Sequence, residues 1–280
     1  MGTLFDFITT VFAYPFMQRA LLAASMTGVV CAVLSCYLVL KGWSLMGDAI
    51  SHAVLPGIVL AFWLAIPLAI GAFISGIFCA VATGYLKENS RIKEDTIMGI
   101  VFSGMFAFGI VLFSRTETDL HLSHILFGNV LGITLQELRQ TSVITIITLL
   151  AVLIKRKDFM LYCFDPHHAK VIGLPVKGLH YGLLCLLALT IVAAIQAVGV
   201  ILVIAMLIAP GMIAFMLCRT FDRMLIIAVL VSVVSCFTGT LVSFHIDGAT
   251  GPSIVIIQAL FFFVVLIYSH VKSVKATMLT

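Results

Sequence analysis

Long apolar runs, separated by short polar segments, cover most of the 280-residue chain. A transmembrane helix needs about 20 mainly apolar residues, and most of these runs reach that length. The pattern therefore predicts an all-α, polytopic membrane bundle of eight or nine transmembrane or re-entrant helices. The expected spans are 20–40, 46–66, 69–86, 95–114, 136–154, 179–198, 200–218, 224–243 and 252–270.

The number of spans depends on the stretch 179–218, which is too long for one crossing and too short for two relaxed ones. Glycine and proline interrupt helices, so Gly199 is the expected bend and Pro210 an expected break in the second half. The step Pro56-Gly57 is expected to end the helix of the second span and to let it move. Eight complete spans with one re-entrant helix remain open beside nine.

Small residues recur every four positions along the third span. A helix with such a face lets another helix approach closely, so we expect tight packing there rather than a ligand site. The stripe consists of Ala72, Gly76, Ala80 and Gly84, with Gly71, Ser75, Cys79 and Thr83 in a parallel row.

Basic residues predict the orientation of the bundle. Cytoplasmic loops of membrane proteins carry an excess of lysine and arginine, and the segment 155–177 holds five of them. Counting outward from that segment places the N-terminus outside and the C-terminus in the cytoplasm. The five residues are Lys155, Arg156, Lys157, Lys170 and Lys177.

The composition agrees with a membrane protein and excludes several functions. Hydrophobic residues make up 62% of the chain and charged residues 10%, against roughly 25% charged in a soluble protein. One transmembrane domain, 1–280, is therefore expected, without a separate catalytic domain and without a removable signal peptide. Neither the phosphate-binding pattern G-x-x-x-x-G-K-[ST] nor the protease pattern H-E-x-x-H is present. The seven cysteines are scattered and are interpreted as small buried apolar residues.

Asp48 and His52 are the polar residues that this apolar chain has to explain. Their i, i+4 spacing puts both side chains on one face of a helix. An ionised aspartate at membrane depth costs on the order of 3 kcal/mol, which a partner must offset. Three interpretations stay open: a solvated pair near a helix end, a proton relay, and a site for a divalent cation such as Mn²⁺, Fe²⁺ or Zn²⁺.

Charge counting favours the cation in a dimer. Two Asp48 carboxylates would neutralise one dication, and two neutral His52 rings would complete four ligands. Such a site carries no net charge into the low-dielectric interior.

Other histidines give weaker signals. His121 and His124, in a predicted external loop, are candidates for an entrance metal site, against the simpler interpretation of a solvated pair. His245 with Asp247 raises the same idea and the same alternative.

Four motifs together resemble a metal permease of the ABC-3 family. They are GWSLMGDAISHAVLPG (42–57), ILFGNVLGIT (125–134), FDPHHAKVIGLP (164–175) and VGVILVIAMLIAPGMIA (198–214), in that order. The first is the specific one, and the likeness runs from about Phe16 to His270.

The resemblance implies an importer subunit in the bacterial cytoplasmic (inner) membrane. It would carry Mn²⁺ or Fe²⁺, with Zn²⁺ as a third candidate, by alternating access, and Asp48 and His52 would coordinate the ion. Its implied partners are a second permease copy or homologue, cytoplasmic ATPase subunits that bind the ATP, an extracytoplasmic metal-binding protein and membrane lipid, but no nucleic acid. No cofactor is bound permanently.

The segment 155–178 resembles the coupling loop that docks into the ATPase. The residues implied in coupling are Asp165, Pro166, Ala169, Gly173 and Leu174. This chain has His167-His168 where many relatives have an acidic residue, so the polar details of docking differ.

A proton-coupled secondary transporter that uses the same Asp/His pair is the alternative. It would need an inverted repeat with broken helices in both halves, and only one D-x-x-x-H segment is convincing.

Overall fold

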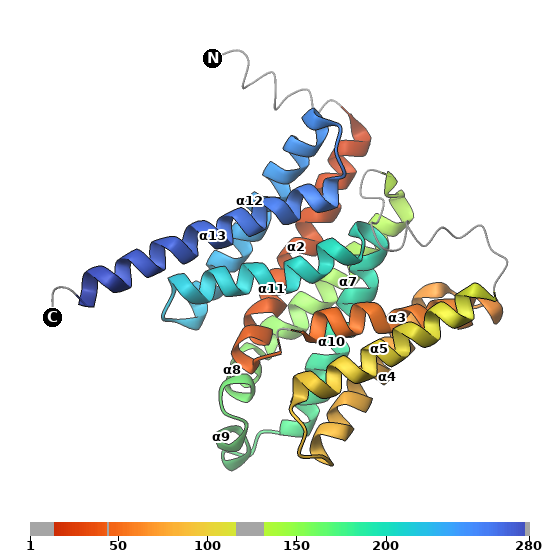
Figure 1. The fold of residues 1–280 in the computed structure, drawn as a ribbon, viewed down its shortest axis with the longest axis horizontal. Helices are drawn as coiled ribbons and strands as arrows, with labels where there is room; N and C mark the ends of the chain where they lie inside the picture. The colour runs from red at the N-terminus through yellow and green to blue at the C-terminus, as the bar shows by residue number, and fades with distance from the viewer. Residues whose placement is uncertain (1–13, 44, 116–131, 278–280) are drawn as a thin grey trace.

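The computed structural model describes residues 14–43, 45–115 and 132–277, and every regular element within them is helical (Figure 1). Nine of the helices are long and apolar enough to cross a membrane, which agrees with the nine expected spans. They are α2 (Pro15–Lys41), α3 (Met46–Trp63), α4 (Leu68–Glu88), α5 (Glu94–Ser114), α7 (Leu135–Ile154), α10 (Val176–Val198), α11 (Val200–Leu217), α12 (Phe221–Ile246) and α13 (Thr250–Thr277). Two short helices, α8 (Arg156–Phe164) and α9 (Pro166–Val171), join α7 to α10.

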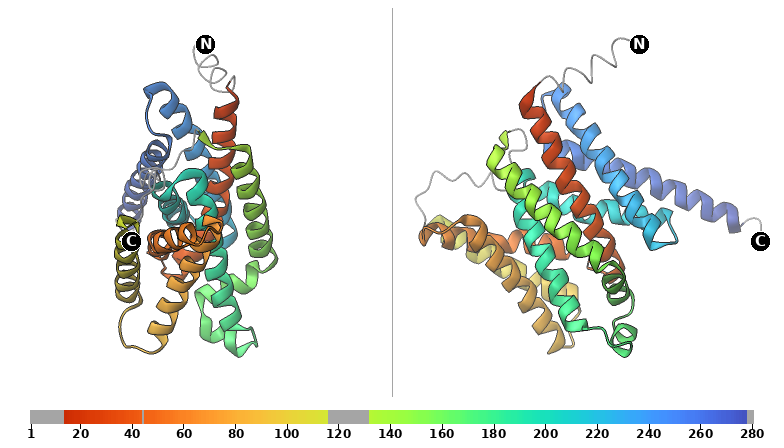
Figure 2. Two further views of the ribbon diagram at one scale, coloured as in Figure 1. Left: turned by 90° about the vertical axis from the view of Figure 1, so that its right-hand side faces the viewer. Right: turned by 180° about the vertical axis from the view of Figure 1, so that it is seen from behind.

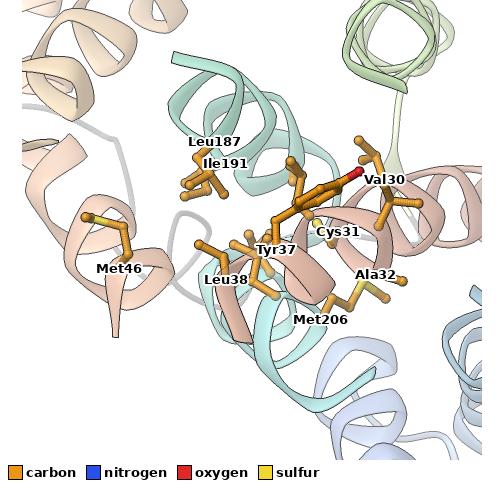
Figure 3. Packing of buried hydrophobic residues seen from close by; sticks show 14 of the residues in the cluster. Val30, Cys31, Ala32, Tyr37, Leu38, Met46, Leu187, Ile191 and Met206 are labelled. Atoms are coloured by element: carbon orange, nitrogen blue, oxygen red, sulfur yellow. The ribbon is translucent and has the colours of Figure 1, made fainter. Parts of the chain in front are cut away.

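Helix α2 lies at the centre of the bundle, in contact with α7, α8, α10, α11 and α12. Its alanines, small polar residues and cysteines are almost all buried, which lets neighbouring backbones come close. Figure 3 shows Tyr37 and Leu38 of α2 near Leu187 and Ile191 of α10 and Met206 of α11. The continuous apolar core is therefore assembled around this one helix.

Two groups of helices flank this centre. Helices α3, α4 and α5 pack on one another on one side, and α11, α12 and α13 do so on the other (Figures 1 and 2). Helix α3 reaches the centre through contacts with α10 and α11. Helices α5 and α13 bury few of their side chains and lie on the same face of the molecule in all three views (Figure 2).

The small-residue stripe of the third span packs as expected. Its members on α4 are buried, except that Gly84 is partly exposed. A Cβ added at Gly76 would touch Ile50 and Val54 of α3 and Ala188 of α10. The stripe therefore lets α4 lie close to both helices, as proposed from the sequence.

Gly199 interrupts the helical path, whereas the two prolines do not. Its φ of +83° lies in the region that favours glycine and separates α10 from α11. Helix α3 continues through Pro56-Gly57 to Trp63, and α11 continues through Pro210 to Leu217. The expected helix end at Pro56 and break at Pro210 are therefore wrong.

Close packing explains why α3 persists beyond its proline. A Cβ added at Gly57 would collide with the carbonyl oxygen of Gly71, and one at Gly71 would collide with the carbonyl oxygen of Gly57. A Cβ added at Gly109 of α5 would lie 2.9 Å from Pro56 Cδ. Neighbouring helices thus hold the segment in place although one backbone hydrogen bond is lost.

Candidate metal site

The first turns of α3 position Asp48 and His52. Gly47 lies against Leu207 of α11, where an added Cβ would come within 2.9 Å of the leucine, and Ser51 Oγ donates to the Gly47 carbonyl over 2.7 Å. Asp48 lies in the first turn, where the positive end of the helix dipole favours a carboxylate. The sequence therefore places the acidic residue where the helix itself offsets part of its charge.

The two side chains meet on one face of α3. His52 Nδ1 lies 3.1 Å from Asp48 Oδ1 and 3.0 Å from the Asp48 carbonyl oxygen. Both neighbours are acceptors, so in the neutral ring Nδ1 carries the proton and donates it. That tautomer leaves the lone pair on Nε2, and a carboxylate or carbonyl partner on the other nitrogen is what orients metal-binding histidines in proteins.

The pair is accessible in the single chain. The Asp48 side chain is 30% exposed and the His52 side chain 25%. Phe102 and Phe106 of α5 flank the imidazole, with ring centroids 6.0 and 5.2 Å away, the second edge-on. The aromatic wall confines the ring, while part of the polar surface stays open.

Pro56 removes one helical hydrogen bond from the backbone of His52. A proline has no N–H to donate to the carbonyl four residues before it, and that carbonyl belongs to His52. Sequence reasoning overlooked this group, although a proline four residues after a histidine is visible in the sequence. It also missed Phe102 and Phe106, which no local pattern connects to His52.

One chain supplies fewer side-chain ligands than a transition metal requires. Within residues 14–43, 45–115 and 132–277, no group of three or more His, Cys, Asp and Glu side chains comes together. Asp48 and His52 provide one carboxylate and one imidazole, whereas four ligands are typical for zinc. Completing the shell needs waters, backbone oxygens or a second subunit.

Among the described residues, no other histidine joins Asp48 and His52 in a metal-binding group. His121 and His124 lie outside the described residues. His245 Nδ1 lies 2.9 Å from the Leu241 carbonyl of its own helix, and Asp247, with a φ of +51°, ends that helix. An entrance site at either place stays a prediction.

The predicted coupling residues build a short helix with both ends closed. Asp165 Oδ1 accepts hydrogen bonds from the N–H groups of His167 and His168 at 2.9 and 3.0 Å, and Pro166 occupies the first turn. These bonds, led by that of His168, hold the pKa of Asp165 below its usual range. The helix therefore begins with a side-chain cap.

The other end of α9 is closed by its backbone. Gly173 has a φ of +85°, its N–H donates to the Lys170 carbonyl, and the Leu174 N–H donates to the Ala169 carbonyl. This pattern is the Schellman motif. Ala169 itself is fully buried, so the small residue there serves close packing.

Large apolar side chains project from both sides of α9. Phe164 is 78% exposed and Val171 is 84% exposed. They belong to the short segment between two spans rather than to a long apolar helix, so they are candidates for a contact with another protein. The sequence motif pointed to this segment, but not to these two side chains.

The chain is similar to known proteins over nearly its whole length. The model of the ABC 3 transport family matches residues 13–269. The chain is 80% identical to the chelated iron transport system membrane protein YfeD of Yersinia pestis, over 98% of this chain and 93% of that protein. It is 54% identical to the manganese transport system membrane protein MntB of Synechocystis, over 91% and 83%.

A solved structure has the same fold. PsaBC from Streptococcus pneumoniae, in complex with Fab, superposes with a TM-score of 0.84 at 37% identity, covering 94% of this chain and 95% of the solved one. The family match, the two relatives and this superposition all extend over nearly the full bundle. The chain belongs to the ABC 3 transport family.

Proposed function

We propose that the chain is the membrane permease of an ATP-driven importer of Mn²⁺ or Fe²⁺ in the bacterial inner membrane, with Asp48 and His52 as ligands of the passing ion. The observation that carries this is the contact of 3.1 Å between the two side chains on α3, in a bundle of apolar helices. Relatives named for chelated iron and for manganese transport support the choice of metal. Zn²⁺ remains the third candidate, because imidazole and carboxylate also suit it.

The ligand chemistry supports a transition metal. Asp48 supplies a negative oxygen, His52 offers Nε2, and the His52 carbonyl lacks its usual helical donor. Nitrogen in the set disfavours Ca²⁺ and Mg²⁺, which prefer shells made of oxygen. Two oxygens and one nitrogen per chain form a weak, incomplete shell, which suits an ion that has to leave again.

A second permease subunit, either a copy or a homologue, would complete the shell. Helix α5, whose phenylalanines flank His52, belongs to the poorly buried face that it shares with α13. A partner seated on that face would bring its own pair towards this one, and two carboxylates would then balance one dication. The described residues of one chain contain no third acidic or imidazole ligand nearby.

The ATPase subunits would dock on α9. This helix is capped at both ends, and Val171 at its end and Phe164 at the end of α8 are exposed to solvent. An element that keeps its shape without further contacts can carry a displacement into the bundle through Ala169. An extracytoplasmic protein would deliver the metal on the opposite side.

The test is metal uptake by cells that carry Asp48→Asn or His52→Ala at normal membrane abundance. Both variants should lose most uptake of ⁵⁴Mn²⁺ and ⁵⁵Fe²⁺, because each removes half of the side-chain ligands. His270→Ala is the control, since His270 is an exposed histidine near the end of α13 and belongs to no candidate site. Wild-type uptake by both variants, at equal abundance, would exclude the proposed site.

A further inference from the structure

A basic pocket of about 220 Å³ lies where α2, α4, α8, α9 and α10 come together, away from the metal site. Three lysines from three separate segments line it: Lys41 at the end of α2, Lys87 at the end of α4 and Lys177 at the start of α10. None of the described residues that line the pocket is acidic. Three lysines therefore line one small volume, and the Lys87 ammonium also donates to the Ile92 carbonyl over 3.5 Å.

The pocket wall is ordered by specific contacts. Tyr162 Oη lies 2.7 Å from His180 Nδ1, and the Lys41 ammonium lies 4.2 Å from the centroid of the Tyr162 ring. Gly84 makes room for the imidazole, because an added Cβ would lie 3.2 Å from His180 Nε2. The phenol and imidazole thus line the same volume as the three ammonium groups.

This combination of groups matches a phosphate. Lysine ammonium groups bind phosphate as point charges. Tyr162 and His180 use one proton in their mutual hydrogen bond, so the neutral pair offers one further donor. The volume is below the roughly 300 Å³ of the smallest pockets for drug-sized ligands, so a phosphate head group suits it better than a whole nucleotide. A metal cation is excluded by the charge of the lining.

The position of the pocket matches the surface of a membrane. Basic pockets between transmembrane helices on the cytoplasmic side bind the head groups of acidic lipids. Tyr181 lines the pocket and is 42% exposed, and Tyr85 beside Gly84 is 63% exposed. Exposed tyrosines are enriched where the bilayer meets water, so the pocket opens at the depth of lipid phosphates.

We propose that this basic pocket binds a phosphate group, carried by an acidic phospholipid of the inner leaflet or present as free phosphate. The site does not depend on the transported metal or on Asp48 and His52. It makes the permease responsive to the anion that occupies the junction between α4 and the coupling segment.

The experiment measures lipid and phosphate binding to the purified full-length permease. The permease is placed in nanodiscs of phosphatidylcholine that contain increasing fractions of phosphatidylglycerol. Native mass spectrometry then counts the phosphatidylglycerol molecules that stay bound after the protein is released from the nanodiscs. In parallel, inorganic phosphate is titrated in detergent while the melting temperature is recorded. Wild type should retain phosphatidylglycerol, gain thermal stability from phosphate, or both. Retention of phosphatidylglycerol from the nanodiscs would identify a lipid as the source of the phosphate group. Stabilisation by inorganic phosphate would identify free phosphate as the source.

Matched variants locate the binding. The triple variant Lys41→Gln/Lys87→Gln/Lys177→Gln should bind the anion at least about tenfold more weakly, because each lysine contributes roughly 1 kcal/mol near an anionic surface. The control variant Lys157→Gln/Lys170→Gln/Lys272→Gln removes the same charge from exposed positions outside the pocket. It should change the affinity for the anion by less than about twofold. The single variants Lys87→Gln and Lys177→Gln serve if the triple variant fails to fold.

Two results would overturn the proposal: no binding of either anion by wild type, or equal losses in the pocket and control variants.

Discussion

At the residue scale, the neighbours of His52 orient its ring and leave Nε2 for the proposed metal. Its Nδ1 donates to Asp48, and Pro56 leaves the His52 carbonyl without a helical donor. The side chains of Asp48 and His52 therefore share one face of α3. That face was predictable because i, i+4 spacing fixes it locally.

The closest backbone approach in the bundle also gives a residue-scale prediction. Gly57→Ala should destabilise the protein by about 1–3 kcal/mol, because the new methyl group meets the Gly71 carbonyl, which is backbone and cannot turn away. Reversible unfolding in dodecyl sulfate measures the change. Gly104→Ala on α5 is the control: an added Cβ there meets nothing within 4 Å, so its effect should stay within about 0.5 kcal/mol. Equal effects for the two variants would disprove the close contact.

At the scale of elements, α9 is a short helix whose ends are both satisfied locally. The isolated helix would be marginal at six residues, and its cap and Schellman motif compensate for that. The short helix was predictable, because Asp165, Pro166 and Gly173 are residue types that begin and end helices, whereas the coupling role of the segment 164–175 stays a prediction. The exposure of Phe164 and Val171 was not predictable, because it depends on where α9 lies relative to the bundle.

Asp165 makes the stability of α9 depend on pH in a defined direction. Its pKa is lowered in the folded state, so the stabilisation is fully present above the unfolded value near 3.9 and is lost as the pH falls through the lower folded value. Hydrogen exchange at the amides of His167 and His168 should therefore be independent of this group between pH 6 and 8 and lose protection only in strong acid.

Substitutions separate the charge of Asp165 from its capping role. Asp165→Ala should lose that protection at neutral pH and weaken ATPase binding several-fold, whereas Asp165→Asn should keep both, because asparagine caps helices equally well. Pull-down of the ATPase subunit from nanodiscs measures the binding. Full binding by Asp165→Ala would show that the cap has no part in coupling.

At the scale of the whole molecule, the sequence predicted the helices well and their contacts poorly. Nine apolar runs gave nine candidate spans, and Gly199 was identified as the bend, because both signals are local. Helices α3 and α11 continue through Pro56 and Pro210, because packing by neighbours outweighs the lost hydrogen bond. The basic pocket is lined by lysines from three segments that are distant in the sequence. The sequence analysis used lysines only to predict the orientation of the helices, so it did not predict this pocket. The orientation of the bundle in the membrane stays a prediction.

The whole chain also allows a test between the two transport mechanisms. Reconstituted alone in liposomes with a proton gradient, it should not accumulate Mn²⁺, because the importer needs ATPase subunits docked on α9. Adding those subunits with ATP, together with the extracytoplasmic metal-binding protein, should restore uptake. Uptake driven by protons without any ATPase would support the secondary transporter and reject the ABC importer.

The mutual fit of Gly57 and Gly71 joins α3 and α4 into one mechanical unit. If the proposed ion path opens by a movement of α3, we expect the far end of α4 to move with it, and there Gly84 and Lys87 form part of the basic pocket. An anchored lipid there would resist that swing. Bacteria that change the acidic lipid content of the inner leaflet would then alter the turnover rate of metal import without touching the ion's own ligands.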